Sequence, residues 1–475
     1  MNENTVFQNP QGINPQSPPY STEIPPPASP SVPPPPPESS LLSAGILIKG
    51  ALGLIFLLIF TFLIFSVIGP RFFKQKPEKI TLTYWGLWED SRVMQAVFAD
   101  FERENPNISV QYVKEDIKQY RNRLLTRIKN GTGADVFRFH NSWVPQLFDV
   151  LLPLSSDVIS ADAFRKQFYP VAQTDLIKNG AIYGIPLEID TLSLFINTEL
   201  FQAASLETPT TWEDFAKSAR VLTVKDETGR IKTSGAALGT FDNITHAPDI
   251  VSLLFVQNGA DIKNLLKTDQ ASSDALSFYA SFASGEGNVW DQTLDPSILA
   301  FAKGNLAMYF GYSWDVFTIK AINPNLSFQI ASVPHLPGRN MTIASYWAEG
   351  VSSKSKHQKE ALLFMKFLAK KETQQKLFTE ISKTRLFGEP YANKELKDLL
   401  KDNQFVYPFV SQADGAVSSF FSSDTFDDGL NSQMNAYLGN AVRSILGNTS
   451  PQSAVETLSS GVSQVLQQYE GTPQK

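Results

Sequence analysis

Cysteine is absent from this chain of 475 residues, and histidine occurs only four times. The lack of cysteine excludes disulfide bonds, thiolate metal sites, cysteine nucleophiles and a lipid anchor attached through an N-terminal cysteine. The histidines at positions 140, 246, 335 and 357 are scattered too widely for a metal-binding motif. The formal net charge of -6 argues against a nucleic-acid partner, which would require a basic surface. We expect neither a metal nor another cofactor.

The usual catalytic signatures are also missing. The chain has no G-x-x-x-x-G-K-[ST], no G-x-S-x-G and no H-E-x-x-H. Residues 424–429 (DTFDDG) resemble the start of a calcium loop, but Phe426 and Asn435 stand where oxygen and bidentate carboxylate ligands belong. The carboxylate pair Glu188 and Asp190 could serve a glycosidase, which is the least favoured of our hypotheses. We therefore expect that the protein is not an enzyme.

The longest apolar run, residues 51–68 (ALGLIFLLIFTFLIFSVI), contains no charged residue. A helix of about 20 apolar residues crosses the hydrocarbon core of a bilayer, so we predict a transmembrane helix over residues 43–69. A cleaved signal peptide is less favoured, because its apolar region would be shorter and would end at a small-residue cleavage site. Four basic residues follow the run and only Lys49 precedes it, which by charge alone places the large domain in the cytoplasm.

Residues 1–42 are rich in proline and poor in apolar residues, which predicts a disordered tail. A docking site for a proline-binding module is the alternative. Residues 70–78 are expected to be a linker, and residues 79–475 have a globular composition. Because about 400 residues exceed what one hydrophobic core supports, we expect two lobes in this part.

Strand and helix patterns alternate from residue 79 onward. Strands are predicted at 79–85, 108–113 and 134–139, with amphipathic helices between them, which favours a mainly parallel sheet covered by helices on both faces. Further strands are predicted at 191–196, 306–310 and 328–333. Helices are expected from a capping box at 210–213 through 221, twice within 247–284, at 358–370 and over 427–469.

Aromatic and carboxamide side chains gather at the predicted strand ends and turns. In open α/β sheets, ligands bind beyond the carboxyl ends of the strands. Aromatic faces there can stack on the C–H patches of a sugar, and nearby Asp, Asn and Glu can pair with its hydroxyls. The alternative is that each ring is a core residue. The candidate ligand-binding residues are Trp85, Trp88, His140, Asn141, Trp143, Glu188, Asp190, Trp314, Tyr346, Trp347 and Glu349.

A series of weak motifs between residues 79 and 381 resembles the family 1 type of extracellular solute-binding proteins, the sugar-binding receptors of ABC importers. The motifs are 80–86 (ITLTYWG), 101–108 (FERENPNI), 131–136 (GTGADV), 183–186 (YGIP), 192–197 (LSLFIN), 209–215 (PTTWEDF), 301–308 (FAKGNLAM), 311–314 (GYSW) and 359–367 (KEALLFMKF). Their order along about 300 residues makes the resemblance specific. The chain departs from the family in lacking a lipoprotein cysteine and in carrying the Pro-rich arm.

The resemblance implies a two-lobed α/β fold of the periplasmic-binding-protein type (type II), with solute bound between the lobes. It places lobe 1 at about 79–190 and 333–385, lobe 2 at about 191–332, and C-terminal helices at 386–470. The crossings between the lobes would lie near 189–194 and 330–334. By similarity, Asp190 matches a ligand-binding carboxylate, Trp314 a stacking ring, and the 140–143 loop and the segment of Tyr346, Trp347 and Glu349 the lining of the cleft.

The resemblance also implies a function. We expect a single-pass membrane protein whose domain lies on the extracytoplasmic side, against the charge count, because long domains translocate largely regardless of flanking charge. It would capture a carbohydrate, most favourably an oligosaccharide, and deliver it to ABC transporter permease subunits, with residues 43–69 held in the lipid bilayer. The alternative is the same fold acting as a ligand sensor or surface-capture protein without transport.

Overall fold

The chain divides into two units, residues 1–76 and 77–475. The computed structural model describes residues 44–64, 66, 79–261 and 270–470. The first unit contains helix α1 (Ala44–Leu63), whose large apolar side chains between Leu52 and Leu63 are at least half exposed. Across the described ranges, no helix combines the length and apolar character that crossing a membrane requires. The predicted tail 1–42 and linker 70–78, and residues 43, 65 and 67–69 of the predicted span, lie outside the described residues.

Lobe 1 of the second unit is built on a five-stranded sheet. Its strand order is β2 (Ile108–Lys114), β1 (Ile80–Gly86), β3 (Val136–His140), β13 (Trp347–Val351) and β6 (Ile185–Pro186). Strand β1 pairs in parallel with β2 and β3, whereas β13 pairs antiparallel with β3 and β6. Helices α3 (Ser91–Glu104) and α14 (Gln358–Leu368) pack on this sheet, and α15 (Lys371–Ser382) packs against α3.

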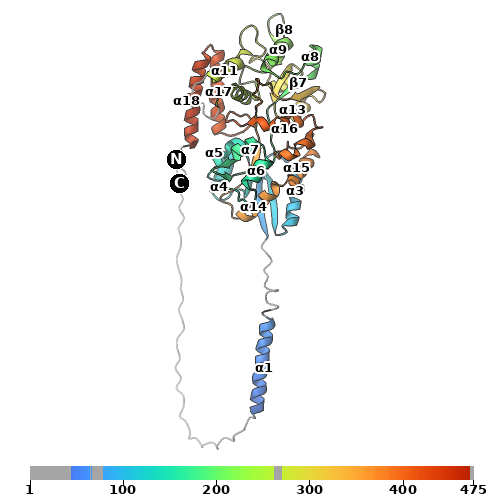
Figure 1. Ribbon diagram of the computed structural model, residues 1–475, viewed down its shortest axis with the longest axis vertical. Helices are drawn as coiled ribbons and strands as arrows, with labels where there is room; N and C mark the ends of the chain where they lie inside the picture. The colour runs from blue at the N-terminus through green and yellow to red at the C-terminus, as the bar shows by residue number, and fades with distance from the viewer. Residues whose placement is uncertain (1–43, 65, 67–78, 262–269, 471–475) are drawn as a thin grey trace, which may run out of the picture. The chain divides into compact units, whose positions relative to one another are not determined.

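Lobe 2 is built on a second five-stranded sheet. Its strand order is β11 (Phe328–Ala331), β7 (Ser193–Asn197), β10 (Leu306–Gly311), β9 (Ile231–Ala236) and β8 (Val224–Lys225). Only β10 and β9 pair in parallel. Helices α8 (Thr198–Ala203), α9 (Trp212–Leu222) and α12 (Ser297–Ala302) contact this sheet. Figure 1 shows the elements of lobe 2 at the top of the second unit and those of lobe 1 below them.

The prediction of a mainly parallel sheet is confirmed for β1, β2 and β3, which pair in parallel, but it did not include the antiparallel strands that make both sheets mixed. The reason is the path of the chain between the lobes. Strand β13 enters lobe 1 from lobe 2, so it begins at the edge where β1 and β3 end, and it runs opposite to them. Strand β7 enters lobe 2 from lobe 1 and begins in the same way, with Ser193 opposite Gly311 at the end of β10.

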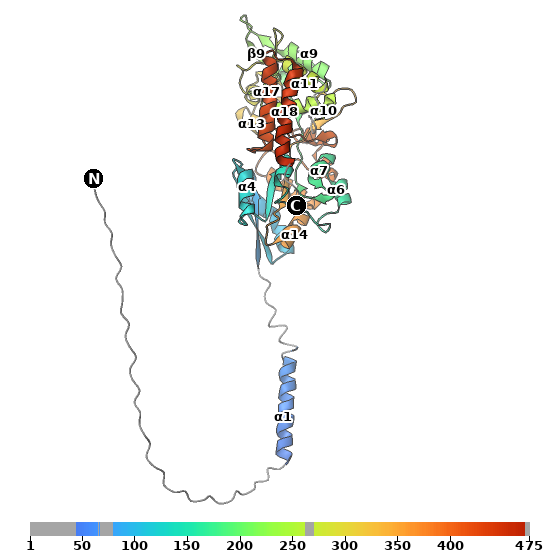
Figure 2. The same ribbon diagram turned by 90° about the vertical axis from the view of Figure 1, so that its left-hand side faces the viewer.

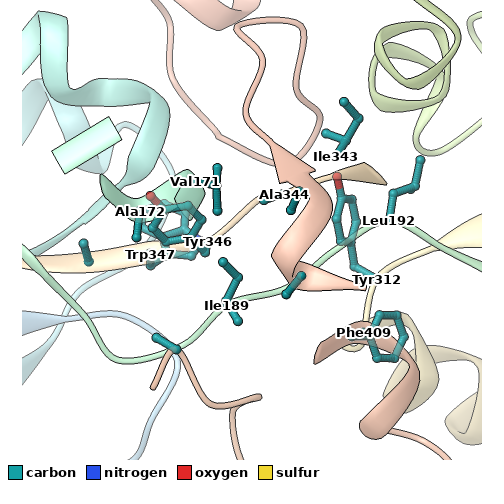
Figure 3. Close-up of a cluster of buried hydrophobic side chains, with 14 of the residues drawn as sticks. Val171, Ala172, Ile189, Leu192, Tyr312, Ile343, Ala344, Tyr346, Trp347 and Phe409 are labelled. Atoms are coloured by element: carbon teal, nitrogen blue, oxygen red, sulfur yellow. The ribbon is translucent and has the colours of Figure 1, made fainter. Parts of the chain in front are cut away.

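Apolar side chains on the crossing segments form a core between the lobes. The first segment joins β6 to β7, and the second joins β11 to β13 through the short strand β12 (Thr342–Ile343). The predicted second crossing at 330–334 falls at the end of β11, and the chain continues to residue 346 before lobe 1 resumes. Figure 3 shows Ile189 and Leu192 of the first segment beside Ile343, Ala344 and Tyr346 of the second.

The chain after residue 386 returns along the crossing segments and then covers both lobes. Helix α16 (Tyr407–Ser411) places Phe409 against Phe195 of lobe 2, and strand β14 (Ala416–Val417) pairs with β12. Helices α17 (Leu430–Leu446) and α18 (Pro451–Glu470) lie side by side (Figure 2). Helix α18 contacts α11 (Gln270–Ser281) of lobe 2 and α5 (Val144–Leu147) of lobe 1, so the C-terminal pair bridges the lobes.

The remaining elements include the buried helix α10, which packs against α11, and several shorter helices, strands and turns. They are α4 (Tyr120–Lys129), α6 (Ala161–Gln167), α7 (Pro170–Leu176), α10 (Ala247–Asn258), α13 (Asp315–Ile322), the hairpin of β4 (Ile177–Lys178) and β5 (Ala181–Ile182), and the 3-10 turns η2 (Asn141–Trp143), η3 (Lys394–Leu400) and η4 (Ala413–Gly415).

The helix predicted at 358–370 is α14, which ends at Leu368, and the helical region predicted over 427–469 consists of two helices, α17 and α18. The amphipathic helix predicted between the first two strands is α3, which buries Val93, Met94, Val97, Phe98 and Phe101 and ends before Asn105. The predicted capping box at 210–213 is wrong by one residue. Thr211 is the N-cap, because its Oγ1 accepts from the N–H of Asp214 at 3.1 Å and the following Trp212 is buried with its indole on Gln257 at 2.7 Å.

Candidate functional site

An aromatic cluster forms where β1 and β3 end and β13 begins. The register of the sheet places Trp347 opposite His140. Three rings make edge-to-face contacts with the Trp347 ring: Trp88, His140 and Trp143, with centroid distances of 4.9, 5.1 and 5.1 Å. Trp347 and Trp143 are buried, whereas Trp88 remains 39% exposed. The structure therefore brings these four predicted residues together, and Trp88 is the ring that the cluster presents to solvent.

His140 is held neutral inside this cluster. Its Nδ1 lies 2.7 Å from Ser142 Oγ and its Nε2 lies 3.0 Å from Ser345 Oγ. Burial lowers the pKa of His140 to about 3. Its imidazole therefore offers hydrogen bonds rather than charge near neutral pH.

Asn141 and Tyr346 converge on a carboxylate that the sequence analysis missed. Asn141 Nδ2 and the Tyr346 hydroxyl both donate to Asp175 Oδ2 at 2.9 Å. Asn141 Oδ1 also accepts from the Tyr346 N–H at 3.3 Å. Asp175 lies in α7, a helix that the sequence analysis did not predict, and nothing in its local pattern signals a site.

Glu349 lies in the interior of lobe 1. Its Oε1 accepts from Arg138 Nε at 2.7 Å and from the Tyr84 hydroxyl at 2.8 Å, and it is fully buried. Arg138 Nη1 also donates to Glu89 Oε2 at 3.0 Å. Trp85 is likewise buried, within β1. These two predicted residues therefore lie in the interior of lobe 1.

Two carboxyl groups share a hydrogen bond beside the crossing segments, and they titrate in opposite directions. Glu188 Oε1 accepts from the Trp347 N–H at 3.2 Å. Burial and the nearby Glu389 raise the pKa of Glu188 well above its usual value. Burial also opposes ionisation of Glu389, but Arg385 at 2.5 Å outweighs it and lowers the pKa of Glu389. Glu188 is thus the member of the pair that holds the proton.

Asp190 links the first crossing segment to lobe 2. Its Oδ1 accepts from the Thr191 N–H and its Oδ2 accepts from the Ser313 N–H, both at 2.9 Å. Burial raises its pKa well above the usual value, although these backbone hydrogen bonds oppose the shift. Ser313 directly precedes Trp314, so the structure places two predicted residues, Asp190 and Trp314, at the same strand end of lobe 2.

Trp314 presents an aromatic face on lobe 2. Its half-buried ring stacks on Tyr312 with 4.5 Å between centroids and 15° between planes. The next residue, Asp315, accepts through Oδ2 from the Tyr309 hydroxyl and from the Tyr312 N–H at 2.9 and 3.1 Å. These bonds fix the turn between β10 and α13 that carries Trp314.

The same turn holds a charged histidine that the sequence analysis left aside. His246 Nε2 lies 2.7 Å from Asp315 Oδ2, and its Nδ1 lies 3.6 Å from Asp424 Oδ2. Burial by itself lowers the pKa of His246, but Asp315, Asp424 and Asp249 outweigh it and raise the pKa to about 9. His246 is therefore protonated near neutral pH. Together with Asp315 it forms a buried ion pair in lobe 2, beside the turn that carries Trp314.

A cavity of about 200 Å³ lies beside Asn141 and Asp175, between lobe 1 and the segment that precedes α17. Its lining consists of Asn141, Ser142, Val144, Pro145, Asp175, Lys178, Ser418, Ser419, Phe420 and Leu466. Six of these ten residues carry hydroxyl, amide, carboxylate or ammonium groups and four are apolar, a mixture that suits a solute with both hydrogen-bonding and apolar faces. Within the described residues, no cluster of three potential metal ligands is found.

Comparisons with known proteins agree with this architecture. The multiple sugar-binding protein of Streptococcus mutans is 23% identical over 343 residues, which cover 68% of this chain and 78% of that protein. The arabinooligosaccharide-binding protein of Halalkalibacterium halodurans is 27% identical over 181 residues, covering 36% of this chain and 38% of that protein.

Solved structures show the same fold. A cyclo/maltodextrin-binding protein complexed with maltotetraose superposes with a TM-score of 0.68 and 19% identity, covering 83% of this chain and 99% of that one. The sugar-binding protein MalE of Xanthomonas citri gives 0.66 and 19%, covering 82% and 98%. Residues 85–375 match the sequence model of the bacterial extracellular solute-binding proteins. The chain belongs to this family of bacterial extracellular solute-binding proteins.

Proposed function

We propose that this protein is a receptor that captures a carbohydrate, and most favourably an oligosaccharide, between its two lobes. The observation that carries the proposal is the presence of aromatic faces beside hydrogen-bonding groups on both lobes, around Trp88 on lobe 1 and Trp314 on lobe 2. Sugars combine C–H faces, which stack on rings, with hydroxyls, which pair with planar polar groups. The sugars named for the relatives and the structural neighbours support the same class of solute.

The predicted site residues have different roles in this proposal. Trp88 and Trp314 retain exposed surface and would stack on the sugar rings. His140, Asn141, Glu188 and Asp190 would exchange their present hydrogen bonds for bonds to sugar hydroxyls. The deeper residues would hold the ligand-contacting groups in place; they are Trp85, Trp143, Tyr346, Trp347 and Glu349.

Solute capture would be coupled to lobe closure. A ligand shifts a conformational equilibrium only through its different affinity for the two states. A sugar that touches Trp88 and Trp314 at once gains both contacts only when the lobes are close. The crossing segments are the elements that would bend during this motion.

A membrane tether and delivery to an ABC permease complete the proposal. The tether is supported by the uncharged run at residues 51–68 and by the exposed apolar side chains of α1. The family is extracellular, which favours an extracytoplasmic domain. Sugar uptake into vesicles that hold this protein and a purified ABC permease would test delivery, and sugar binding without uptake would favour the sensor alternative.

Thermal unfolding of the full chain in detergent tests the binding step. A panel of mono- and oligosaccharides would be compared with amino acids, polyamines and anions. A solute present at 100 times its Kd stabilises the folded state by about 2.7 kcal/mol. We expect a shift with one sugar class that Trp314→Ala abolishes. Val224→Ala, which truncates an exposed side chain of β8, is the matched control and should keep the shift.

A further inference from the structure

The segment that joins β14 to α17, residues 418–429, lies between the lobes and is called the strap here. Its first eight residues (SSFFSSDT) include five with a hydroxyl group: Ser418, Ser419, Ser422, Ser423 and Thr425. Phe421 is fully buried and lies against Phe255 of α10, which anchors the strap on lobe 2. Ser422 and Thr425 are also buried, at 2% and 4% exposed, and buried hydroxyl groups need hydrogen-bond partners. Hydrogen bonds to both lobes add to the apolar anchor.

On the side of lobe 1, the strap binds groups that follow β3 or lie in α7. Ser418 Oγ donates to Asp175 Oδ1 at 2.5 Å. Gln146 Nε2 donates to Asp427 Oδ2 at 3.0 Å. Just past the strap, Ser142 Oγ donates to Asn431 Oδ1 at 3.0 Å. The strap therefore occupies the carboxyl-end edge of the first sheet.

On the side of lobe 2, the strap binds the start of α10 and the residue before it. Ser423 Oγ lies 2.7 Å from His246 Nδ1, and the Ser423 N–H donates to Asp249 Oδ2 at 3.0 Å. Ser419 Oγ lies 2.9 Å from Ser252 Oγ. Because His246 is protonated, its Nδ1–H donates and the Ser423 hydroxyl accepts. The strap thus runs between the two lobes and forms hydrogen bonds to charged groups of each lobe.

The contacts with lobe 1 follow the end of β3, at the kind of sheet edge where ligands of open α/β sheets bind, and the contacts with lobe 2 are made at the start of α10. A carboxylate that accepts from one hydroxyl and an imidazolium that donates to another are the contacts that a sugar would make. We propose that the strap is an internal substitute for the solute, which clasps the lobes in the empty protein and must leave when a neutral, hydroxyl-rich solute binds. This inference rests on the proposed function for its second part, because displacement requires a sugar.

The backbone of the strap is suited to leaving. Asp424 and Phe426 have φ values of 55° and 52°, in the left-handed region that residues with a Cβ rarely adopt. Strain of this kind persists only when surrounding contacts impose it, and it favours release. The Phe426 ring is 48% exposed and would lose little packing by moving, whereas Asp424 would give up its approach to His246 at 3.6 Å.

The proposal predicts a competition between strap and sugar. The apparent affinity of a ligand is reduced by the fraction of molecules that are not binding-competent. Removing two strap hydroxyls that bond to charged groups weakens the clasp by about one order of magnitude in its equilibrium constant. The sugar affinity should then rise, whereas removal of an ordinary binding residue would lower it.

The test uses the full chain in detergent and compares wild type with the double variant Ser418→Ala and Ser423→Ala. The matched control is Ser463→Ala, whose hydroxyl bonds only within α18. With maltotetraose as the probe, and the relatives' other sugar classes as alternatives, we expect calorimetry to show about tenfold tighter binding for the double variant. Unchanged or weaker binding than in wild type would overturn the displacement.

Amide hydrogen exchange without sugar tests the clasp separately. The strap and the N–H groups around Ser313 should exchange faster in the double variant than in wild type and in the Ser463→Ala control. Equal exchange in all three proteins would overturn the clasp. If no sugar binds any of them while the exchange still differs, the sugar-receptor proposal fails and the clasp stands.

Discussion

Protonation of the buried His246 makes the stability of this protein depend on pH in the alkaline range. The pKa of His246 is raised from 6.5 to about 9 in the folded state, because Asp315, Asp424 and Asp249 outweigh the effect of burial. The folded protein therefore binds this proton more tightly than the unfolded chain. The resulting stability is fully present below pH 6.5 and is lost as the pH rises through about 9. Since one pKa unit corresponds to about 1.4 kcal/mol, the loss amounts to about 3 kcal/mol.

Urea unfolding of wild type and His246→Gln at several pH values between 6.5 and 9.5 measures this loss. The variant should be less stable than wild type at the lower pH values. Between pH 6.5 and 9.5, its free energy of unfolding should fall by about 3 kcal/mol less than that of wild type. The comparison of slopes removes contributions from other groups. Asp424, with a pKa of about 6, is ionised over most of this range, and neutral His140 titrates only at lower pH. Equal slopes for the two proteins would refute the assignment of a protonated His246.

Three further predictions concern the interior. Arg138→Met leaves the buried carboxylates of Glu89 and Glu349 without their cation, and urea unfolding should show a loss of about 3–5 kcal/mol; a loss below about 1 kcal/mol would contradict the network. Gly235→Ala brings a Cβ within 1.9 Å of the Ala219 carbonyl oxygen and should lower the melting temperature, whereas Gly287→Ala meets nothing and should not. The stability that depends on neutral His140 is present above pH 6.5 and lost toward pH 3, so His140→Gln should flatten the acid limb of the stability curve.

Local patterns predicted the elements of this fold better than their pairing. The apolar spacing of Val93, Met94, Val97, Phe98 and Phe101 gave the buried face of α3, because helical periodicity is a local property. Strand β13 was not predicted as a strand, because its sequence (WAEGV) contains Glu349 and Gly350, which are uncommon in buried strands. Its antiparallel direction depends on a crossing between lobes that no local pattern encodes.

The candidate site was predictable only in part, for a related reason. Aromatic residues at strand ends indicated the cluster around Trp347, since the carboxyl ends of neighbouring strands meet in space. Asp175 and His246 were not among the candidates. They lie in α7 and just before α10, outside the segments whose motifs were recognised. The strap was invisible to sequence analysis, since a hydroxyl-rich stretch before a helix is usually a solvated loop.

Calorimetric titration of the full chain with maltotetraose and with arabino- and manno-oligosaccharides is the most direct test of carbohydrate capture. We expect one-to-one binding of at least one of these sugar classes, with the heat lost in Trp314→Ala and retained in Val224→Ala. Heat with amino acids, polyamines or anions, and none with any sugar, would contradict carbohydrate capture while leaving the two-lobed fold in place.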